Sequence, residues 1–139
     1  MSVSLYCLLG FAVWTHVVLM TTIGLHRWTQ VLTGRAPIHA FRADRPEGPG
    51  WYRRAMRAHA NCVENLPVFG AVVVTATLSG RAGSFIADLS VATLAARVCQ
   101  SITHIAFVET ARTVSVRFTF FAVQVFAMLG MAFAVVGAG

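Results

Sequence analysis

Residues 3–25, VSLYCLLGFAVWTHVVLMTTIGL, contain no Asp, Glu, Lys or Arg. A helix that spans a membrane needs about 20 mostly apolar residues, and this stretch is long enough. Inside a bilayer the backbone must satisfy its own hydrogen bonds, so the stretch is expected to be helical. It lacks a preceding basic residue and a small-residue cleavage site. We therefore expect a retained span and not a signal peptide.

Three further stretches are apolar over a similar length, with at most two charged residues each: 60–79, 85–108 and 118–136. Together with residues 3–25 they predict four membrane spans. The expected fold is all-α, an integral membrane four-helix bundle that forms a single domain over residues 1–139. The intervening basic segment, residues 26–52, contains several Gly and Pro and is expected to be a loop and not a folded domain.

The overall composition supports lipid as the main solvent of this chain. Hydrophobic residues make up 57% of it and charged residues 12%, which is about half the charged share of an average globular protein. A soluble shell is excluded by the shortage of charge. Disorder is excluded because the chain is too apolar.

The net charge of +6 comes from eleven arginines, with no lysine. No nucleic-acid-binding motif accompanies them, so nucleic acid is not an expected partner. Seven of the arginines lie at residues 27–57, between the first and second spans. The first and third connections of a four-span bundle lie on one side of the membrane. The excess of arginine predicts that this side is cytoplasmic and that both termini are opposite.

Polar residues within the second and third spans fall on one face of each predicted helix. In the second span the residues at 54, 57, 61, 64 and 65 cover an arc of roughly 100°. In the third span the residues at 97, 100 and 104 have the spacing i, i+3 and i+7. If the two faces meet, they enclose a positively charged pocket that opens to the cytoplasm. The residues concerned are Arg54, Arg57, Asn61, Glu64, Asn65, Arg97, Gln100 and His104.

Such a pocket suits a small anion that carries several carboxylates and an amine. Guanidinium groups bind carboxylates with two parallel hydrogen bonds. Glu64 is placed to bind an ammonium group, and Asn61 to bind a peptide amide. Arg112, just after the third span, is expected at the mouth of the pocket. The alternative is that Glu64 pairs with Arg57 or Arg97 and only holds the helices together.

The run at residues 54–69, RAMRAHANCVENLPVF, resembles the signature of the membrane-associated proteins in eicosanoid and glutathione metabolism, the MAPEG family. The signature has Arg, two residues, Arg-Ala-His or Arg-Ala-Gln, and then Asn, Glu, Pro and Phe at these spacings. Arg97, Gln100 and His104, with Arg112 beyond them, are more loosely similar to the family's second glutathione-binding stretch. The four-span layout also agrees.

The resemblance implies a homotrimer that binds glutathione, a co-substrate, between neighbouring subunits. It implies that Arg57, Asn61 and Glu64 bind the carboxylates and the amine of glutathione, with Arg54 in support. It also implies that Arg112 stabilises the glutathione thiolate, with Arg117 as the competing candidate. The implied activity is a membrane-bound transferase or peroxidase, in which the thiol attacks a lipophilic electrophile or hydroperoxide.

Three positions differ from members with well-defined activity: Ala60, Gln100 and His104. They motivate the alternative of a non-catalytic trimer that acts as a membrane scaffold or subunit. No metal site is predicted, and His16 and His26 are expected to form interhelical or interfacial hydrogen bonds. The lysine-free basic set and the form of the signature favour a bacterial protein of the inner membrane, where membrane lipids surround it.

Overall fold

The computed structural model describes residues 1–42, 44–45 and 47–137. Residues 43, 46, 138 and 139 belong to the predicted domain, and the first two also to the predicted loop; they lie outside the described residues. The elements are α1 (Val3–Val18), the π-helical segment η1 (Leu19–Gly24), α2 (Leu25–Leu32), the 3-10 turn η2 (Ile38–Ala40), α3 (Gly50–Leu78), α4 (Ser84–Ala106) and α5 (Ala111–Gly137).

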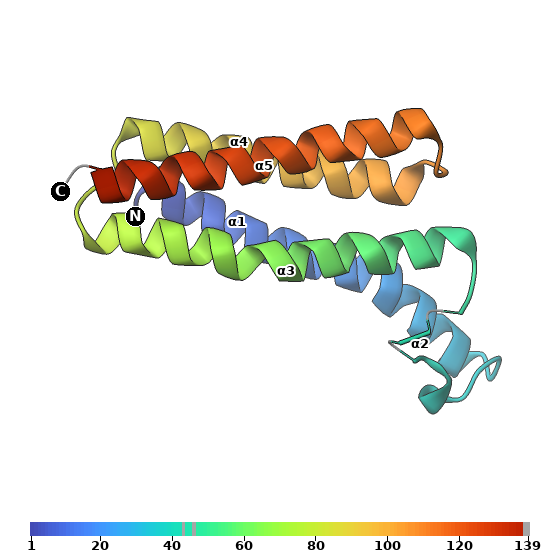
Figure 1. Cartoon of the computed structure of the whole chain (residues 1–139). Helices are drawn as coiled ribbons and strands as arrows, with labels where there is room; N and C mark the ends of the chain where they lie inside the picture. The colour runs from blue at the N-terminus through green and yellow to red at the C-terminus, as the bar shows by residue number, and fades with distance from the viewer. Residues whose placement is uncertain (43, 46, 138–139) are drawn as a thin grey trace.

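Four continuous helical stretches are long and apolar enough to cross a membrane: Val3–Leu32, Gly50–Leu78, Ser84–Ala106 and Ala111–Gly137. In Figure 1, α1, α3, α4 and α5 lie side by side along their lengths. The prediction of an all-α four-helix bundle is confirmed.

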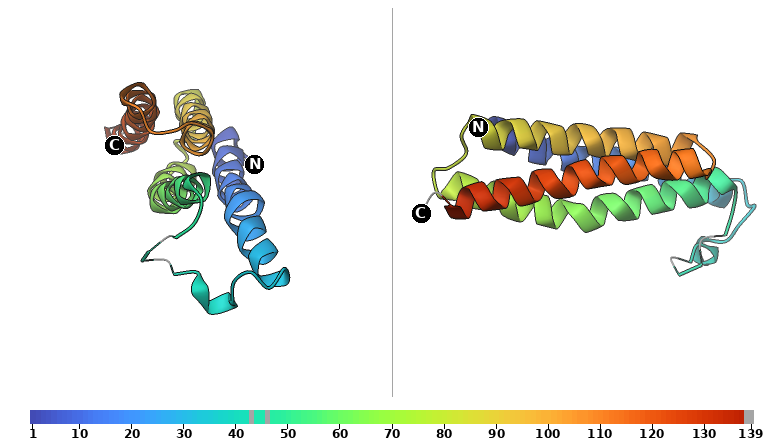
Figure 2. Two further views of the ribbon diagram at one scale, coloured as in Figure 1. Left: turned by 90° about the vertical axis from the view of Figure 1, so that its right-hand side faces the viewer. Right: turned by 45° about the horizontal axis from the view of Figure 1, so that its top comes forward.

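The ends of the bundle differ in charge. The start of α1, the end of α5 and the α3–α4 connection lie at one end (Figures 1 and 2). The α4–α5 connection lies at the other end, beyond which α2 and the long first connection extend. We call this second end the basic end because residues 27–57, with seven of the eleven arginines, lie on its side. The first and third connections therefore lie at the same end, as predicted.

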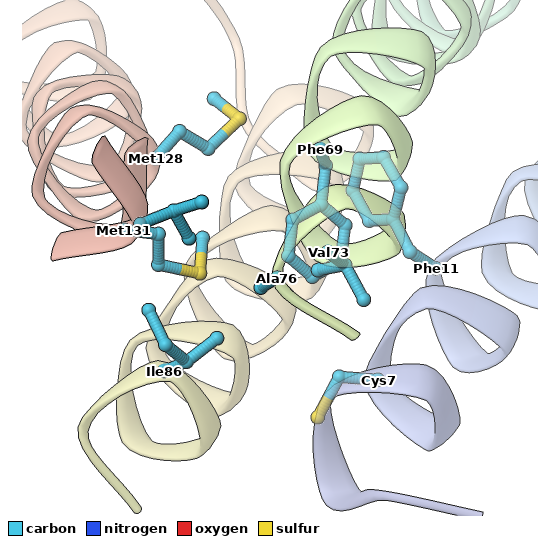
Figure 3. Packing of buried hydrophobic residues seen from close by; sticks show 9 residues of the cluster. Cys7, Phe11, Phe69, Val73, Ala76, Ile86, Met128 and Met131 are labelled. Atoms are coloured by element: carbon cyan, nitrogen blue, oxygen red, sulfur yellow. The ribbon is translucent and has the colours of Figure 1, made fainter. Parts of the chain in front are cut away.

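The apolar core of the bundle lies toward the end that carries the two termini. Figure 3 shows side chains from four helices meeting there: Cys7, Phe11, Phe69, Val73, Ala76, Ile86, Met128 and Met131. The rings of Phe11 and Phe69 meet edge to face, with their centroids 5.6 Å apart. Large apolar side chains such as Phe126 and Phe133 point outward instead. Because lipid tails are as apolar as these side chains, close packing and interhelical hydrogen bonds hold the helices together.

A second contact fixes the first helical stretch against the start of α3. Ile23, Tyr52 and Ala55 are buried together. Arg27 donates a hydrogen bond from Nε to the Tyr52 hydroxyl at 2.8 Å. The ring of His26 packs on that of Tyr52, with centroids 4.5 Å apart. These contacts hold the helix at the point where it leaves the bundle.

Glycines end two of the helices in the same way. Gly34 follows α2 with φ 67° and Gly80 follows α3 with φ 70°, values that residues with a Cβ rarely adopt. The N–H of Arg35 bonds to the carbonyl of Gln30, and that of Arg81 to Ala76. This is the Schellman arrangement, which satisfies carbonyls that the helix end leaves free.

Three helices extend well beyond the predicted spans, and α3 does so at its start, which is Gly50 and not residue 60. The first helical stretch continues beyond residue 25 as α2, which ends at Leu32. In η1, just before α2, Thr21 and Thr22 donate their hydroxyls to the carbonyls of Val17 and Val18. The last begins at Ala111 and not at residue 118. There the Thr110 hydroxyl accepts a hydrogen bond from the N–H of Thr113 at 3.2 Å, as an N-capping side chain does. Hydropathy predicted the apolar part of each helix. It did not predict the polar residues that continue the helix beyond the apolar stretch.

Candidate functional site

A buried polar network joins α4 to α5 in the half of the bundle nearer the basic end. Gln124 donates from its amide to the Gln100 Oε1 at 3.0 Å, and Gln100 donates to the backbone carbonyl of Arg117 at 3.1 Å. The Arg117 Nη1 lies 3.0 Å from the His104 Nδ1. All four side chains are buried. Arg117 also forms an ion pair with Glu109 at 3.4 Å, and this carboxylate is exposed.

The network contains two of the predicted site residues, Gln100 and His104, and two that the prediction treated differently. Arg117 was only the competing candidate for the thiolate role. Gln124 was missed, although a signal for it was present: it is a polar amide within an otherwise apolar span, and such residues are costly in lipid unless they are paired.

The polar residues of α3 at 54, 57, 61, 64 and 65, which we call the polar stripe, lie beside the contact with α4. They do not point directly at α4. Ala55, Ala58 and Cys62 belong to the buried face of α3, and the Cys62 Sγ lies 3.5 Å from the Ser101 Oγ of α4. The stripe is displaced around the helix from this face, and its members differ in exposure. Arg54, Asn61 and Asn65 are half-buried, whereas Arg57 and Glu64 are exposed.

Two hydrogen bonds show how the half-buried members of the stripe are held. Arg54 donates from Nε to the carbonyl of Ile105, near the end of α4, at 3.2 Å. The Asn65 amide donates to the carbonyl of Asn61 at 2.9 Å. The predicted closure of both stripes around one pocket is therefore found only in part within a single chain. Arg54 reaches α4, and Glu64 faces outward.

Arg97 takes part in none of the hydrogen bonds that join Gln100, His104, Arg117 and Gln124. Its side chain is only 1% exposed, and its guanidinium lies over the Phe11 ring, 5.5 Å from the centroid. Within the described residues, its Nε and Nη2 have no hydrogen-bond partner. A guanidinium over an aromatic face gains a favourable cation–π interaction, which offsets part of the cost of its burial. Arg97 therefore contacts α1 through the Phe11 ring.

A groove of about 390 Å³ opens at the basic end, between the start of α3 and the α4–α5 connection. It is lined by Gly50, Arg53, Arg54, Arg57, Val108 and Glu109. Three guanidinium groups against one carboxylate give it a positive charge. Since Glu109 also pairs with Arg117, the groove borders the buried network. The arrangement suits an anionic ligand with an additional cationic group.

Arg112 and Arg117 lie in different surroundings, although both belong to α5. Arg112 is exposed in its first turn, whereas Arg117 is buried and contacts His104. Within one chain, Arg117 is thus the guanidinium that joins the network. An exposed Arg112 is available to a ligand that lies at the surface of the bundle.

A protein-family model described as the MAPEG family matches residues 4–137, which is nearly the whole chain. The chain belongs to the MAPEG family. None of the curated proteins and none of the solved structures compared with it matches.

This MAPEG protein is an integral membrane protein of a family whose members are typically glutathione-dependent transferases or peroxidases. The run at residues 54–69 that resembles the family signature lies within α3. Two of its arginines, Arg54 and Arg57, also line the basic groove. The family motif and the observed groove therefore share residues.

Proposed function

We propose that this MAPEG protein is a membrane-bound glutathione-dependent transferase or peroxidase that acts on lipophilic compounds. The basic groove carries the proposal, because it combines several guanidinium groups with a carboxylate at the edge of an apolar bundle. Glutathione has two carboxylates, an amine and a thiol, which match this set of charges. The family membership supports the same ligand.

In the proposed complex, Arg54 and Arg57 of the groove bind the carboxylates of glutathione, and Glu64, about two turns further along α3 and outside the groove lining, binds its amine. Asn61 binds a peptide amide. Arg57 and Glu64 are exposed in a single chain, so a neighbouring copy can supply the other wall of the site. We propose a homotrimer in which the exposed Arg112 completes that wall, whereas Arg97, Gln100 and His104 support it from within the bundle, where they are buried. The residues that face lipid deliver the apolar substrate.

The proposed chemistry depends on forming the glutathione thiolate. A free thiol has a pKa of about 8.5, and lowering it by about two units takes roughly 2.7 kcal/mol of preferential stabilisation of the anion. One guanidinium in a partly desolvated site supplies stabilisation of this order. The thiolate then forms a C–S bond with the electrophile, and the leaving group departs with the electron pair. With a hydroperoxide, the thiolate sulfur attacks the terminal oxygen and the O–O bond breaks. The sulfur is oxidised to a sulfenic acid, and the alkoxide leaves with the electron pair and takes a proton from water to give the alcohol. A second glutathione thiol then reduces the sulfenic acid, which gives glutathione disulfide and water.

Calorimetric titration of glutathione into the detergent-solubilised protein tests the binding step. We expect saturable binding near one site per chain. Arg57→Gln and Glu64→Gln are expected to weaken it about tenfold each, as the loss of a hydrogen bond to a charged group does. Arg45→Gln, in the exposed first loop, is the matched control. Absence of saturation at millimolar glutathione contradicts the enzyme proposal.

The two candidate arginines are separated by comparing turnover with binding. We expect Arg112→Gln to lower kcat at least a hundredfold while glutathione still binds, because the lost contact is with the thiolate alone. If Arg117→Gln has this effect and Arg112→Gln does not, the thiolate role belongs to Arg117. Full turnover in the Arg112→Gln protein excludes the role proposed for Arg112.

We also propose that the basic end lies in the cytoplasm and that the membrane is a bacterial inner membrane. Connections rich in arginine are retained on the cytoplasmic side. Fusion of a reporter that is active only in the cytoplasm tests this orientation. Activity is expected when the reporter is inserted at Arg45, and the opposite pattern contradicts the orientation.

A non-catalytic scaffold is the second candidate, and one observation favours it. Gln100, His104 and Arg54 are already bonded within the chain, to Gln124, Arg117 and Ile105. In this case the polar residues lock the helices together, and no electrophile is turned over. Size-exclusion chromatography of the Arg57→Gln and Glu64→Gln variants separates the two functions. Intact assemblies that do not bind glutathione favour the glutathione-dependent enzyme. Dissociated chains favour the scaffold, in which these residues hold the helices together.

A further inference from the structure

His104 and Arg117 form a side-chain pair that neither the family membership nor the proposed thiolate chemistry explains. His104 lies near the end of α4 and Arg117 in the second turn of α5. The Arg117 Nη1 lies 3.0 Å from the His104 Nδ1, and both side chains are buried. The contact therefore lies inside the bundle, where bulk water does not compete for it.

The chemistry of the two groups fixes where the proton of the imidazole lies. A guanidinium in a protein is always charged and can only donate hydrogen bonds. The His104 Nδ1 must then accept, so it carries no proton. A neutral imidazole with an unprotonated Nδ1 has its proton on Nε2. The pair thus selects one tautomer of a neutral ring.

Other contacts hold Arg117 in the position that this requires. The carbonyl of Arg117 accepts the amide of Gln100, and its guanidinium pairs with Glu109. The charged groups near His104 are Arg57 of α3, Arg97 of α4, Arg117 of α5 and Glu109 of the connection between α4 and α5.

We propose that Arg117 is a positioning residue that holds His104 as a neutral imidazole with its proton on Nε2. His104 thereby presents a fixed N–H donor to an anionic group of the ligand. The tautomer follows from the contact with Arg117 alone. The identity of the ligand as glutathione rests on the proposed function.

Nitrogen-15 NMR of the histidine-labelled full-length protein in lipid bilayers tests the tautomer without any ligand. The His104 signals are identified by their loss in the His104→Gln variant. We expect an unprotonated Nδ1 and a protonated Nε2 in the wild type. Arg117→Met should give the averaged signals of two exchanging tautomers, whereas Arg117→Lys, which keeps a cationic donor, should retain one. Arg45→Gln is the charge-matched control and should leave the signals unchanged.

A proton on Nδ1, or averaged signals, in the wild type overturns the proposal even if Arg117→Met does not fold. Glutathione is then added to the same samples, and a shift of the His104 Nε2 signal is expected. His104→Leu should weaken binding about tenfold, and His104→Gln, which keeps an N–H donor, should recover most of it. If glutathione binds by calorimetry without moving the Nε2 signal, the donor role is wrong. If glutathione does not bind while His104 keeps a single tautomer, the proposed function is wrong but the positioning role of Arg117 is confirmed.

Discussion

Gln124 links α5 to α4 inside the bundle, and the energy of this link can be measured at the level of two residues. Its amide donates to the Gln100 Oε1 and to the carbonyl of Phe120. Gln124→Leu leaves the Gln100 acceptor buried without this partner, so we expect a lower unfolding temperature. The double-mutant cycle with Gln100→Leu should give a coupling of about 0.5 to 2 kcal/mol, the range of interhelical hydrogen bonds in membranes. Additive effects of the two substitutions would show that the bond contributes nothing.

For single residues, the sequence predicts which face of a helix is polar but not which side chains that face contacts. The spacing of Arg97, Gln100 and His104 indicated one polar face, and all three are buried. The spacing did not reveal that Arg97 packs on Phe11 while His104 contacts Arg117. Helical periodicity gives the direction of a side chain from its own axis. Its partners depend on how the helices are rotated against one another, which a single sequence does not encode in its periodicity.

At the scale of the elements, Arg81 joins the α3–α4 connection to the end of α5. Its Nη1 donates to the carbonyl of Val135, in the last turn of α5. A cation at a helix C-terminus also interacts favourably with the helix dipole. Arg81→Gln removes the charge, and we expect a loss of about 0.5 to 1 kcal/mol of local stability. Hydrogen exchange should become faster in the last turn of α5 and stay unchanged near Gln124. Unchanged exchange in that turn would contradict the capping role.

Helix bounds show the same division between what the sequence predicts and what it does not. The second span was predicted at residues 60–79, and α3 spans Gly50–Leu78, so it begins ten residues earlier. Its Pro67 lies within the helix. α5 begins seven residues before the predicted span at 118–136, because residues 111–117 include several polar side chains and the Thr110 cap sets the start of the helix. Hydropathy detects contact with lipid, whereas the cap decides where the helix begins.

For the whole molecule, the exposed charges on α3 support the proposal that the complete unit contains more than one chain. Arg57 and Glu64 lie on the outside of the bundle, in a helix long and apolar enough to cross the membrane. A charged side chain that faces lipid is costly. A neighbouring copy that covers this edge of α3 would remove the cost and would also complete a ligand site. Assembly and binding are therefore expected to depend on the same edge.

We expect the protein in mild detergent or lipid nanodiscs to assemble as three chains of 15.0 kDa each, about 45 kDa of protein by native mass spectrometry. Glu64→Gln and Arg57→Gln should keep this mass and lose glutathione affinity, because neutral amides tolerate burial at an interface better than an unpaired charge. Glu47→Gln and Arg45→Gln, in the exposed first loop, are the matched controls. A single chain of 15.0 kDa in lipid at every protein concentration would contradict the trimer, and the exposed charges would then need a partner other than a second copy.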